Sequence, residues 1–322
     1  MALLPHPKGV SLAEGFYIPG QVIETVTMTD TQTIAQNVAA LYAAPDTDSE
    51  MVTQAVLGDR VTVLEGRDGF SRVSTADRYS GWVDSRLLVP FQDLSDRPDA
   101  VVQTLFADIF VAPNPRAEMV TKLVAGTRVA LPRRAPEGDW IELTLPDGTG
   151  GFVYWATLTQ DAPEARLTDA VTSSLTRAAV ISALGRNAAE TAWRFVGTPY
   201  LWGGCTPFGT DCSGLTQLVY KLTGMTLLRD AALQFGDKRF VRVEEGLGLD
   251  AALLEDGDLV AFSRREDKQP THIGIALEDG RFLHARGGRG VRVDFCDTPD
   301  YTETYVGAVR LSADAEFSVQ SA

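Results

Sequence analysis

Short stretches of alternating hydrophobic and polar residues dominate the first half of the chain. Between residues 33 and 160, Gly, Pro and Asp interrupt the alternation at short intervals, a pattern typical of small antiparallel barrels. The segment LYAAPDTDSEMVTQAVLGDRVTV, which starts at Leu41, also matches IFVAPNPRAEMVTKLVAGTRVAL, which starts at Ile109, at an offset of 68 residues. We therefore predict two copies of one all-β module, at residues 33–92 and 99–160, with one small length change between them.

The second half of the chain combines helical and strand-like patterns. An Ala-rich segment predicts a linker helix within residues 161–184 and a further helix at 186–195, which opens a third domain spanning residues 185–312. Strand-like runs follow: GDLVAFS, HIGIALE, RFLHARG, VRVDFC and YVGAVRL. The pattern thus predicts a multidomain protein, with two small all-β barrels before an α+β domain. We expect residues 1–32 to be an N-terminal extension and 313–322 a frayed tail.

Composition narrows the classes of partner. The chain has 322 residues and a net charge of -14, which repels nucleic acid and anionic lipid surfaces. The longest uncharged runs are too short and too polar to cross a bilayer, and the first residues lack the apolar stretch of a secretory signal. We therefore expect a cytoplasmic protein without nucleic-acid or membrane partners. A trimmed leader would instead imply secretion or the periplasm.

Cys212 is the first candidate for chemistry. It lies directly before apolar residues that recur at i, i+3, i+4 and i+7 from Leu215 to Leu222, which predicts a helix with one buried face. Asp211 would cap this helix and place the thiol in its first turn, where free backbone N–H groups lower the pKa of a thiol and can bind an oxyanion. The alternative is a small buried residue that packs the start of the helix.

Two of the three histidines, His272 and His284, lie in the third domain and could supply a base and its orienting partner. A two-residue turn at Asp279 and Gly280 would send the two rings to opposite faces of a hairpin. A three-residue turn at 278–280, with Gly in the left-handed position after a type I turn, places Gly274 opposite His284. His272 then lies on the same face, about 7–8 Å away along the diagonal. We predict the three-residue turn, and room above the sheet at Gly274.

A zinc site is the competing use of these residues. The three cysteines lie at 205, 212 and 296, and neither a C-x-x-C nor an H-x₃₋₅-H spacing occurs. An odd number of cysteines in a long chain also argues against a disulfide framework. We expect reduced thiols and no metal or organic cofactor, with Cys205 a loop or core thiol and Cys296 a structural residue at the end of a strand.

The motifs YLWGG and DCSGL (residues 200–215), followed by THIGIAL and FLHA, resemble those of the NlpC/P60 cysteine peptidases, which are papain-like hydrolases of bacterial cell-wall peptides. The two barrels resemble bacterial SH3-like domains. The resemblance implies that Cys212 is the nucleophile, His272 the base and acid, and His284 the group that fixes the imidazole of His272. It also places Tyr200 beside the nucleophile, as a residue that helps to bind substrate or the oxyanion.

The same resemblance implies a substrate-binding set. Asp211 and Ser213 match a pair that contacts the substrate backbone, and Asp211 would offer its carboxylate to a free α-amine. Arg229 and Asp230 match a segment that lines the pocket and would bind D-glutamate or the diamino acid. Ala231 departs from relatives that carry Ser there. For Asp211 the alternative is a helix cap, for Tyr200 packing against its neighbours, and for Arg229 and Asp230 a solvated pair.

Tandem SH3-like domains before such a domain resemble the γ-D-glutamyl-L-diamino acid endopeptidases, also called dipeptidyl-peptidase VI. This implies hydrolysis of the γ-D-Glu–diamino acid bond in murein peptides with a free N-terminal L-Ala, in cell-wall peptide recycling. Tyr79 and Asp59 are possible contributions of the first barrel to amine recognition, or ordinary surface residues. The alternatives are an N-acetylmuramoyl-L-alanine amidase, an acyltransferase on a related Cys-His scaffold, or a non-catalytic wall-binding protein.

Overall fold

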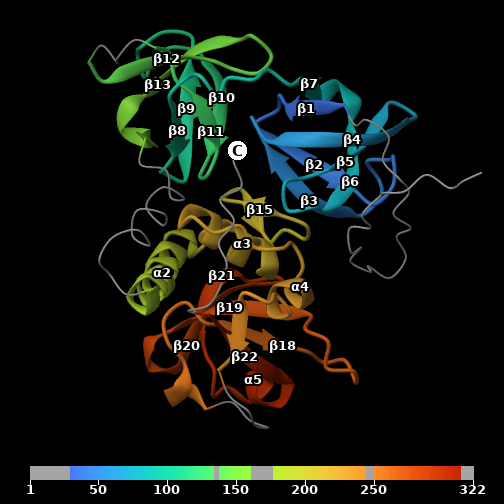
Figure 1. Cartoon of the computed structure of the whole chain (residues 1–322), viewed down its shortest axis with the longest axis vertical. Coiled ribbons are helices and arrows are strands. Elements are labelled where there is room, and N and C mark those ends of the chain that lie inside the picture. The colour runs from blue at the N-terminus through green and yellow to red at the C-terminus, as the bar shows by residue number, and fades with distance from the viewer. Residues whose placement is uncertain (1–29, 134–137, 161–176, 244–249, 313–322) are drawn as a thin grey trace, which may run out of the picture.

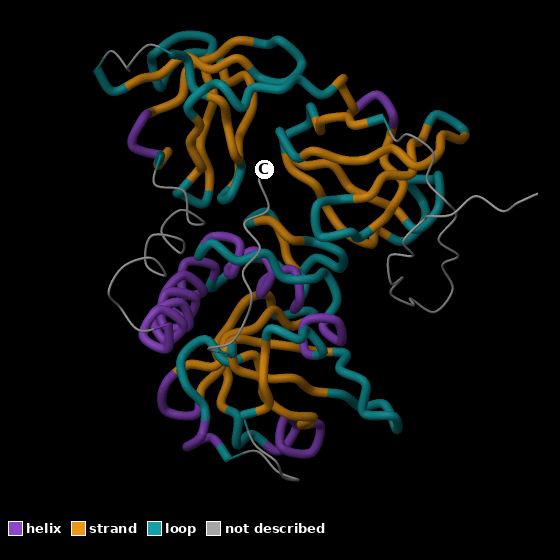
Figure 2. The backbone as a smooth tube through the Cα atoms, viewed as in Figure 1, coloured by secondary structure: helices purple, strands orange, loops and turns teal. Residues whose placement is uncertain are grey.

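Two β-barrels and one α+β domain follow one another along the chain, and both barrels lie at the same end of the third domain (Figure 1). The computed structural model describes residues 30–133, 138–160, 177–243 and 250–312. The predicted tail and most of the predicted N-terminal extension and linker helix lie outside these ranges, and the first strand starts at Thr31, two residues before the predicted start of the first barrel. Strands dominate the two barrels, and helices are concentrated in the third domain (Figure 2).

The first barrel is one seven-stranded antiparallel sheet with the order β3-β2-β6-β5-β4-β1-β7. Alternation explains its core, because inward-facing residues such as Leu41, Val73 and Val83 are fully buried. A short 3-10 helix, η1, precedes the last strand. The bounds are β1 Thr31–Ile34, β2 Val38–Tyr42, β3 Met51–Val56, β4 Arg60–Arg67, β5 Phe70–Ser74, β6 Ser80–Asp84, η1 Ser85–Leu87 and β7 Leu88–Pro90.

The second barrel repeats the first, strand for strand. Strands β1 to β3 recur 68 residues later as β8 to β10, whereas β5 and β6 recur 70 residues later as β12 and β13. The fourth strand of each copy also starts at the 68-residue offset, so the predicted length change is a two-residue insertion between the starts of β11 and β12. The bounds are β8 Asp99–Val102, β9 Phe106–Phe110, β10 Met119–Val124, β11 Arg128–Ala130, β12 Trp140–Thr144, β13 Gly150–Tyr154, η2 Trp155–Thr157 and β14 Leu158–Thr159.

The third domain opens with α2, Arg177–Ala192, which continues into the 3-10 helix η3, Trp193–Phe195. The predicted break near residue 185 is wrong, because one helix runs through it. Gly185 allows α2 to approach the neighbouring loop, since a Cβ there would lie 2.5 Å from the Asp256 carbonyl oxygen. Helix α3, Cys212–Leu222, packs beside α2 and buries one face, as its spacing predicts.

A six-stranded antiparallel sheet with the order β17-β22-β18-β19-β20-β21 completes the domain. Helices α2 and α3 cover one face, and α5 covers the other. The remaining bounds are β15 Cys205–Thr206, β16 Gly209–Thr210, α4 Ala231–Phe235, β17 Phe240–Arg242, η4 Ala251–Leu253, β18 Leu259–Phe262, β19 His272–Leu277, η5 Glu278–Gly280, β20 Arg281–Arg286, β21 Gly290–Phe295, α5 Pro299–Thr304 and β22 Tyr305–Leu311.

Both barrels contact the third domain close to the start of α3. A Cβ on Gly203, which has a φ of +74°, would lie 2.4 Å from the Met51 carbonyl oxygen of β3. The rings of Phe106 and Phe208 lie 4.9 Å apart and join the second barrel to the same region. Within the described residues, no helix is long and apolar enough to cross a membrane.

Candidate active site

Cys212 is the first residue of α3, and Asp211 caps the helix by accepting a hydrogen bond from the Gly214 N–H at 2.7 Å. Gly214 is required by packing, because a Cβ there would lie 2.1 Å from the Gly204 carbonyl oxygen. The Asp-Cys-Ser-Gly sequence therefore holds the thiol where a loop, a helix start and a strand meet. Cys212 is 8% exposed.

The hairpin of β19 and β20 brings the two histidines together. Ile275 pairs with Leu283 and Leu277 with Arg281, which leaves the predicted three-residue turn and confirms the predicted register. The type I turn is wrong, because Asp279 as well as Gly280 adopts a positive φ. His272 Nε2 lies 2.6 Å from His284 Nδ1, so both rings are on one face.

Glycine at 274 makes this arrangement possible. A Cβ there would lie 3.0 Å from His284 Cβ and 2.7 Å from Phe282 Cδ2. The predicted space above Gly274 is thus filled by the neighbouring strand's side chains. His284 is fully buried, whereas His272, at the start of β19, is half-buried.

The comparisons with known proteins agree with this geometry. Residues 197–310 match the NlpC/P60 family, and residues 41–88 match the bacterial dipeptidyl-peptidase Sh3 domain. The third domain is therefore an NlpC/P60 cysteine peptidase domain. The fold of the chain, an SH3-like region followed by an NlpC/P60 catalytic domain, is the predicted one.

Two curated relatives align along most of their length. A γ-D-glutamyl-L-lysine dipeptidyl-peptidase of Bacillus cereus is 27% identical over 81% of this chain and 75% of the relative. Dipeptidyl-peptidase 6 of Lysinibacillus sphaericus is 28% identical over 80% and 89%, respectively. A solved NlpC/P60 family protein from Bacillus cereus superposes with a TM-score of 0.70 at 24% identity, over 87% of this chain and 99% of the other, which shows a shared fold.

The NlpC/P60 thiol is neutral in the resting structure. Burial raises the pKa of Cys212 to about 11, and the negative charge of Asp211 adds to this. The N–H groups of Ile273 and Ser213 and the charge of Arg229 lower the pKa by less. The predicted lowering of the thiol pKa at the helix start is therefore wrong, because burial outweighs the local N–H groups. The contact with Ile273 N–H also places the sulfur beside the backbone of β19, one residue along the chain from His272.

Both imidazoles are neutral as well. Burial lowers the pKa of His272 to about 3, and the neighbouring His284 lowers it further. Burial likewise lowers the pKa of His284 to about 4, against the opposing effect of Asp294, whose Oδ2 lies 3.1 Å from His284 Nε2. A neutral thiol can react with a neutral imidazole as its general base, in which case the proton leaves sulfur as the new bond forms.

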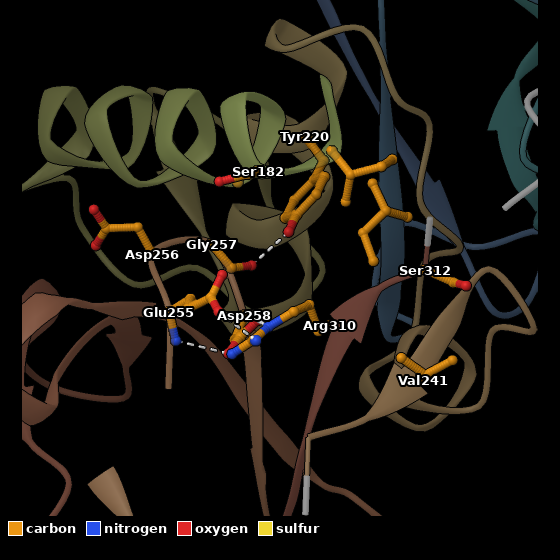
Figure 3. Close-up of a pocket in the computed structure, with 12 residues that line it drawn as sticks. Ser182, Tyr220, Val241, Glu255, Asp256, Gly257, Asp258, Arg310 and Ser312 are labelled. Carbon is orange, nitrogen blue, oxygen red and sulfur yellow. Dashed lines mark hydrogen bonds and ion pairs between the residues drawn. The ribbon is translucent and has the colours of Figure 1, made fainter. Parts of the chain in front are cut away.

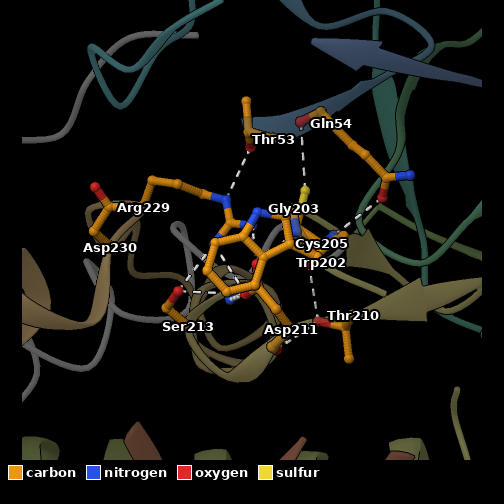
Figure 4. Close-up of polar contacts among 12 residues, drawn as sticks. Thr53, Gln54, Trp202, Gly203, Cys205, Thr210, Asp211, Ser213, Arg229 and Asp230 are labelled. Carbon is orange, nitrogen blue, oxygen red and sulfur yellow. Dashed lines mark hydrogen bonds and ion pairs between the residues drawn. The ribbon is translucent and has the colours of Figure 1, made fainter. Parts of the chain in front are cut away.

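Asp211, Ser213 and Arg229 form one buried network, with Thr53 of the first barrel as its fourth member (Figure 4). Arg229 Nη1 lies 3.0 Å and Nη2 2.5 Å from the two carboxylate oxygens of Asp211, and Nη1 also donates to Ser213 Oγ at 2.9 Å. Asp211 additionally accepts from the Gly203 N–H. Arg229 is 2% exposed, which excludes the alternative that it forms a solvent-exposed pair with Asp230.

This network changes the interpretation of two predicted binding residues. The prediction that Asp211 offers a free carboxylate to an amine is wrong for this structure, because Arg229 and backbone N–H groups already occupy both oxygens. The prediction that Arg229 itself binds the substrate is wrong for the same reason. The pair is buried against the first barrel, so each charge needs the other as its counterion and neither is available to a ligand.

Asp230 has a different environment from Arg229. It is exposed, and its carboxylate accepts a hydrogen bond from the Tyr79 hydroxyl of the first barrel at 3.3 Å. Nearby, Trp202 is 60% exposed, and its Nε1–H donates a hydrogen bond at 2.7 Å to Glu50, the residue directly before β3. The first barrel therefore brings Glu50 and Tyr79 to the loops that flank Cys212. Of the two barrel residues considered from sequence, Tyr79 is at this site, whereas Asp59 lies 3.7 Å from Lys221 at the far end of α3.

Tyr200 lies close to the nucleophile. Burial raises its pKa to about 12, with a further contribution from the charge of Cys212 in its thiolate form. Cys205 is half-buried at the barrel interface, where its N–H donates to Gln54 Oε1 at 3.0 Å. Cys296 is buried directly after β21, and burial raises its pKa to about 12. No cluster of three His, Cys, Asp or Glu side chains suited to a metal occurs among the described residues.

A cavity of about 310 Å³ lies elsewhere in the domain, between α2 and the ends of β18 and β22 (Figure 3). Its polar lining is satisfied internally, because Arg310 pairs with Asp258 at 2.8 Å and Glu255 at 2.6 Å. None of the predicted site residues line it. The chemistry therefore centres on the start of α3 and not on this cavity.

Proposed function

We propose that this NlpC/P60 peptidase hydrolyses the amide bond between γ-D-Glu and the diamino acid of murein peptides that carry a free N-terminal L-Ala. The names of the relatives support a peptidase of cell-wall peptides. The observation that carries the finer proposal is the contact between the first barrel and the loops around Cys212. There Tyr79 meets Asp230, and Glu50 meets Trp202.

In the proposed reaction Cys212 is the nucleophile and His272 the base. The thiol proton passes to Nδ1 of His272, the ring nitrogen that His284 does not engage, and the sulfur electron pair forms a bond to the γ-carbonyl carbon. Backbone N–H groups at the start of α3, with Tyr200 nearby, stabilise the oxyanion by hydrogen bonds. Collapse expels the amine of the diamino acid, which takes the proton from His272, and water then hydrolyses the thioester.

Recognition of the amine follows from which carboxylates are accessible. An ammonium group that leaves water needs a carboxylate partner to offset its desolvation. Because Asp211 is paired with Arg229, we assign this role to Asp230 and Glu50, both exposed, with Tyr79 between barrel and domain. A peptide extended beyond L-Ala would collide with the barrel, which limits the substrate to a free terminus.

We further propose that the enzyme is cytoplasmic and acts on released peptides in recycling. An acidic chain with an amine-selective site suits small soluble peptides better than anchoring to an insoluble polymer. No metal or organic cofactor takes part in the proposed steps. Ser213, buried and bonded to Arg229, acts in this proposal by holding the network beside the nucleophile.

The test is a product analysis by mass spectrometry on L-Ala-γ-D-Glu-diaminopimelate, its lysine counterpart and the N-acetylated form of each. We expect release of the diamino acid from the free peptides only, and none from the Cys212→Ala variant. Equal cleavage of blocked and free peptides would favour an amidase or acyltransferase. Inert wild-type protein on every peptide would contradict the enzyme proposal.

A further inference from the structure

His284 is the most constrained side chain of the site. It is fully buried, and both ring nitrogens face a polar partner: Nδ1 faces His272 Nε2 at 2.6 Å, and Nε2 faces Asp294 Oδ2 at 3.1 Å. The pairing of β20 with β21 explains the second contact. His284 pairs with Arg292 and Phe282 with Asp294, so Asp294 is the diagonal neighbour of His284 on the same face.

Asp294 is itself held from several sides. The Tyr301 hydroxyl of α5 donates to Oδ2 at 2.7 Å, and Arg292 Nη2 lies 2.5 Å from Oδ1. Arg286 donates to the Tyr301 oxygen at 2.7 Å, which directs the hydroxyl hydrogen towards Asp294. The hydrogen bonds from Tyr301 and His284 lower the pKa of Asp294 despite partial burial, so this carboxylate is an acceptor only.

These contacts fix where the protons lie. An ionised Asp294 can only accept, so His284 carries its hydrogen on Nε2. The Tyr301 oxygen, 3.4 Å from the same nitrogen, is a second acceptor because its own hydrogen is given to Asp294. His284 Nδ1 then carries a lone pair and no hydrogen, so His272 must donate a hydrogen bond to it from Nε2. In that tautomer His272 Nδ1 carries the lone pair that can take the thiol proton.

We propose that Asp294, held by Tyr301 and Arg292, is a positioning residue that sets the tautomer of His284 and, through it, the basic nitrogen of His272. The inference rests on the proposed role of His272 as base. Asp294, Tyr301 and Arg292 were not among the residues predicted from the sequence. When His272 becomes an imidazolium, its Nε2–H still points to the His284 lone pair, so no proton needs to move beyond His272. The charged or titratable groups facing His284 are His272 from β19, Arg286 from β20, Arg292 and Asp294 from β21, and Tyr301 from α5, whereas Asp300 of α5 acts on His272 and pairs with Arg286.

The direct test is ¹⁵N-edited NMR of the full chain, in which only three histidines contribute signals. We expect His284 of the wild type to be the neutral Nε2–H tautomer at pH 7. In Asp294→Asn, an amide can turn its NH₂ group towards the ring, so the fixed tautomer should be lost. Asp300→Asn is the matched control, because it removes an equal charge from Arg286 but leaves the Asp294 contact intact.

A second readout does not need the murein substrate. The rate at which iodoacetamide alkylates Cys212 reports proton transfer to His272, so it distinguishes failure of this inference from failure of the proposed function. We expect Asp294→Asn to lower this rate at pH 7, and kcat where turnover is measured, by about 10- to 100-fold with little change in KM. Asp294→Glu should recover part of the loss, and Asp300→Asn should behave as wild type.

Two results would overturn the inference. One is a wild-type His284 in the Nδ1–H tautomer. The other is an Asp294→Asn variant that keeps the wild-type tautomer and alkylation rate. Should Asp294→Asn fail to fold, Tyr301→Phe removes one donor to the carboxylate without removing the charge, and an unchanged pH profile of alkylation in that variant would also count against the role of this cluster.

Discussion

The buried pair of Arg229 and Asp211 gives the sharpest prediction of stability and activity together. Arg229→Met keeps much of the side-chain volume and removes the positive charge. Four hydrogen bonds are lost, two to Asp211, one to Ser213 and one across the domain interface to Thr53. Asp211 keeps its backbone N–H partners, but its charge then has no counterion, although the residue is only 7% exposed.

The magnitude follows from this burial. Removing one partner of a buried ion pair costs about 3–5 kcal/mol of unfolding free energy, because the other charge stays desolvated and unpaired. Activity should fall as well. The charge of Asp211 raises the pKa of Cys212 and that of Arg229 lowers it, so the variant's thiol gives up its proton less readily.

Urea denaturation of four proteins measures the effect: wild type, Arg229→Met, Asp211→Asn and the double variant. We expect the double variant to be more stable than the sum of the single changes predicts, by about 1–3 kcal/mol, because it leaves no unpaired charge. Arg265→Met is the control. Its pair with Asp267 is exposed, so its loss should leave the urea midpoint at the wild-type value.

The reasoning would be refuted by either of two results. An Arg229→Met protein that unfolds at the wild-type urea concentration would show that the ion pair carries no net stability. Strict additivity in the double variant would show that Arg229 and Asp211 do not interact as the structure indicates.

Three further predictions concern packing, pH and recognition. Gly274→Ala should cost about 1–3 kcal/mol in urea denaturation and lower kcat, because its Cβ would displace His284, whereas Gly287→Ala, with nothing within 4 Å, should be neutral. Burial lowers the pKa of His272 and His284 from 6.5 to about 3 and about 4, so the unfolded chain binds protons at a higher pH than the folded chain does. The contribution of these histidines to the free energy of unfolding should therefore be complete above pH 6.5 and fall as the pH drops towards 3. A urea midpoint that stays constant between pH 7 and 4 would contradict this. Asp230→Asn should lower kcat/KM for free-amine peptides by about 30-fold or more, and an unchanged value would remove Asp230 from amine recognition.

Local patterns in the sequence carry most of the fold. The 68-residue repeat reappears in the bounds of three strands, and the spacing after Cys212 gives the buried face of α3. The hairpin register was predictable because turn length, the glycine at 280 and the need for both rings on one face all favour the same pairing. The break predicted near residue 185 fails because buried residues before and after the glycine, such as Leu184 and Ala188, pack in the same core. A single Gly in such an Ala-rich run does not end the helix.

Contacts between distant segments could not be predicted in the same way. Tyr79 and Asp230 are 151 residues apart, and nothing in either segment indicates the other. Asp294 did leave a signal. The alternation of VRVDF puts it on the same face as Arg292, and pairing β21 with β20 would have placed it near His284. What was missing was the register of that second hairpin, whose turn gave no preference as clear as that at residues 278–280.

Two of the errors at the site, the pKa of the Cys212 thiol and the free carboxylate of Asp211, have one physical cause. A motif can place a thiol at a helix start and a carboxylate beside it, but the pKa of the thiol and the availability of the carboxylate depend on how much water remains around them. Burial removes that water. It raises the pKa of Cys212, commits Asp211 to Arg229, and leaves Asp230 as the accessible charge. In the proposed function, recognition of the amine depends on the domain interface more than on the Asp-Cys-Ser-Gly motif. Variants of Tyr79 or Glu50 should then alter preference for the free amine without changing the reactivity of Cys212 towards iodoacetamide.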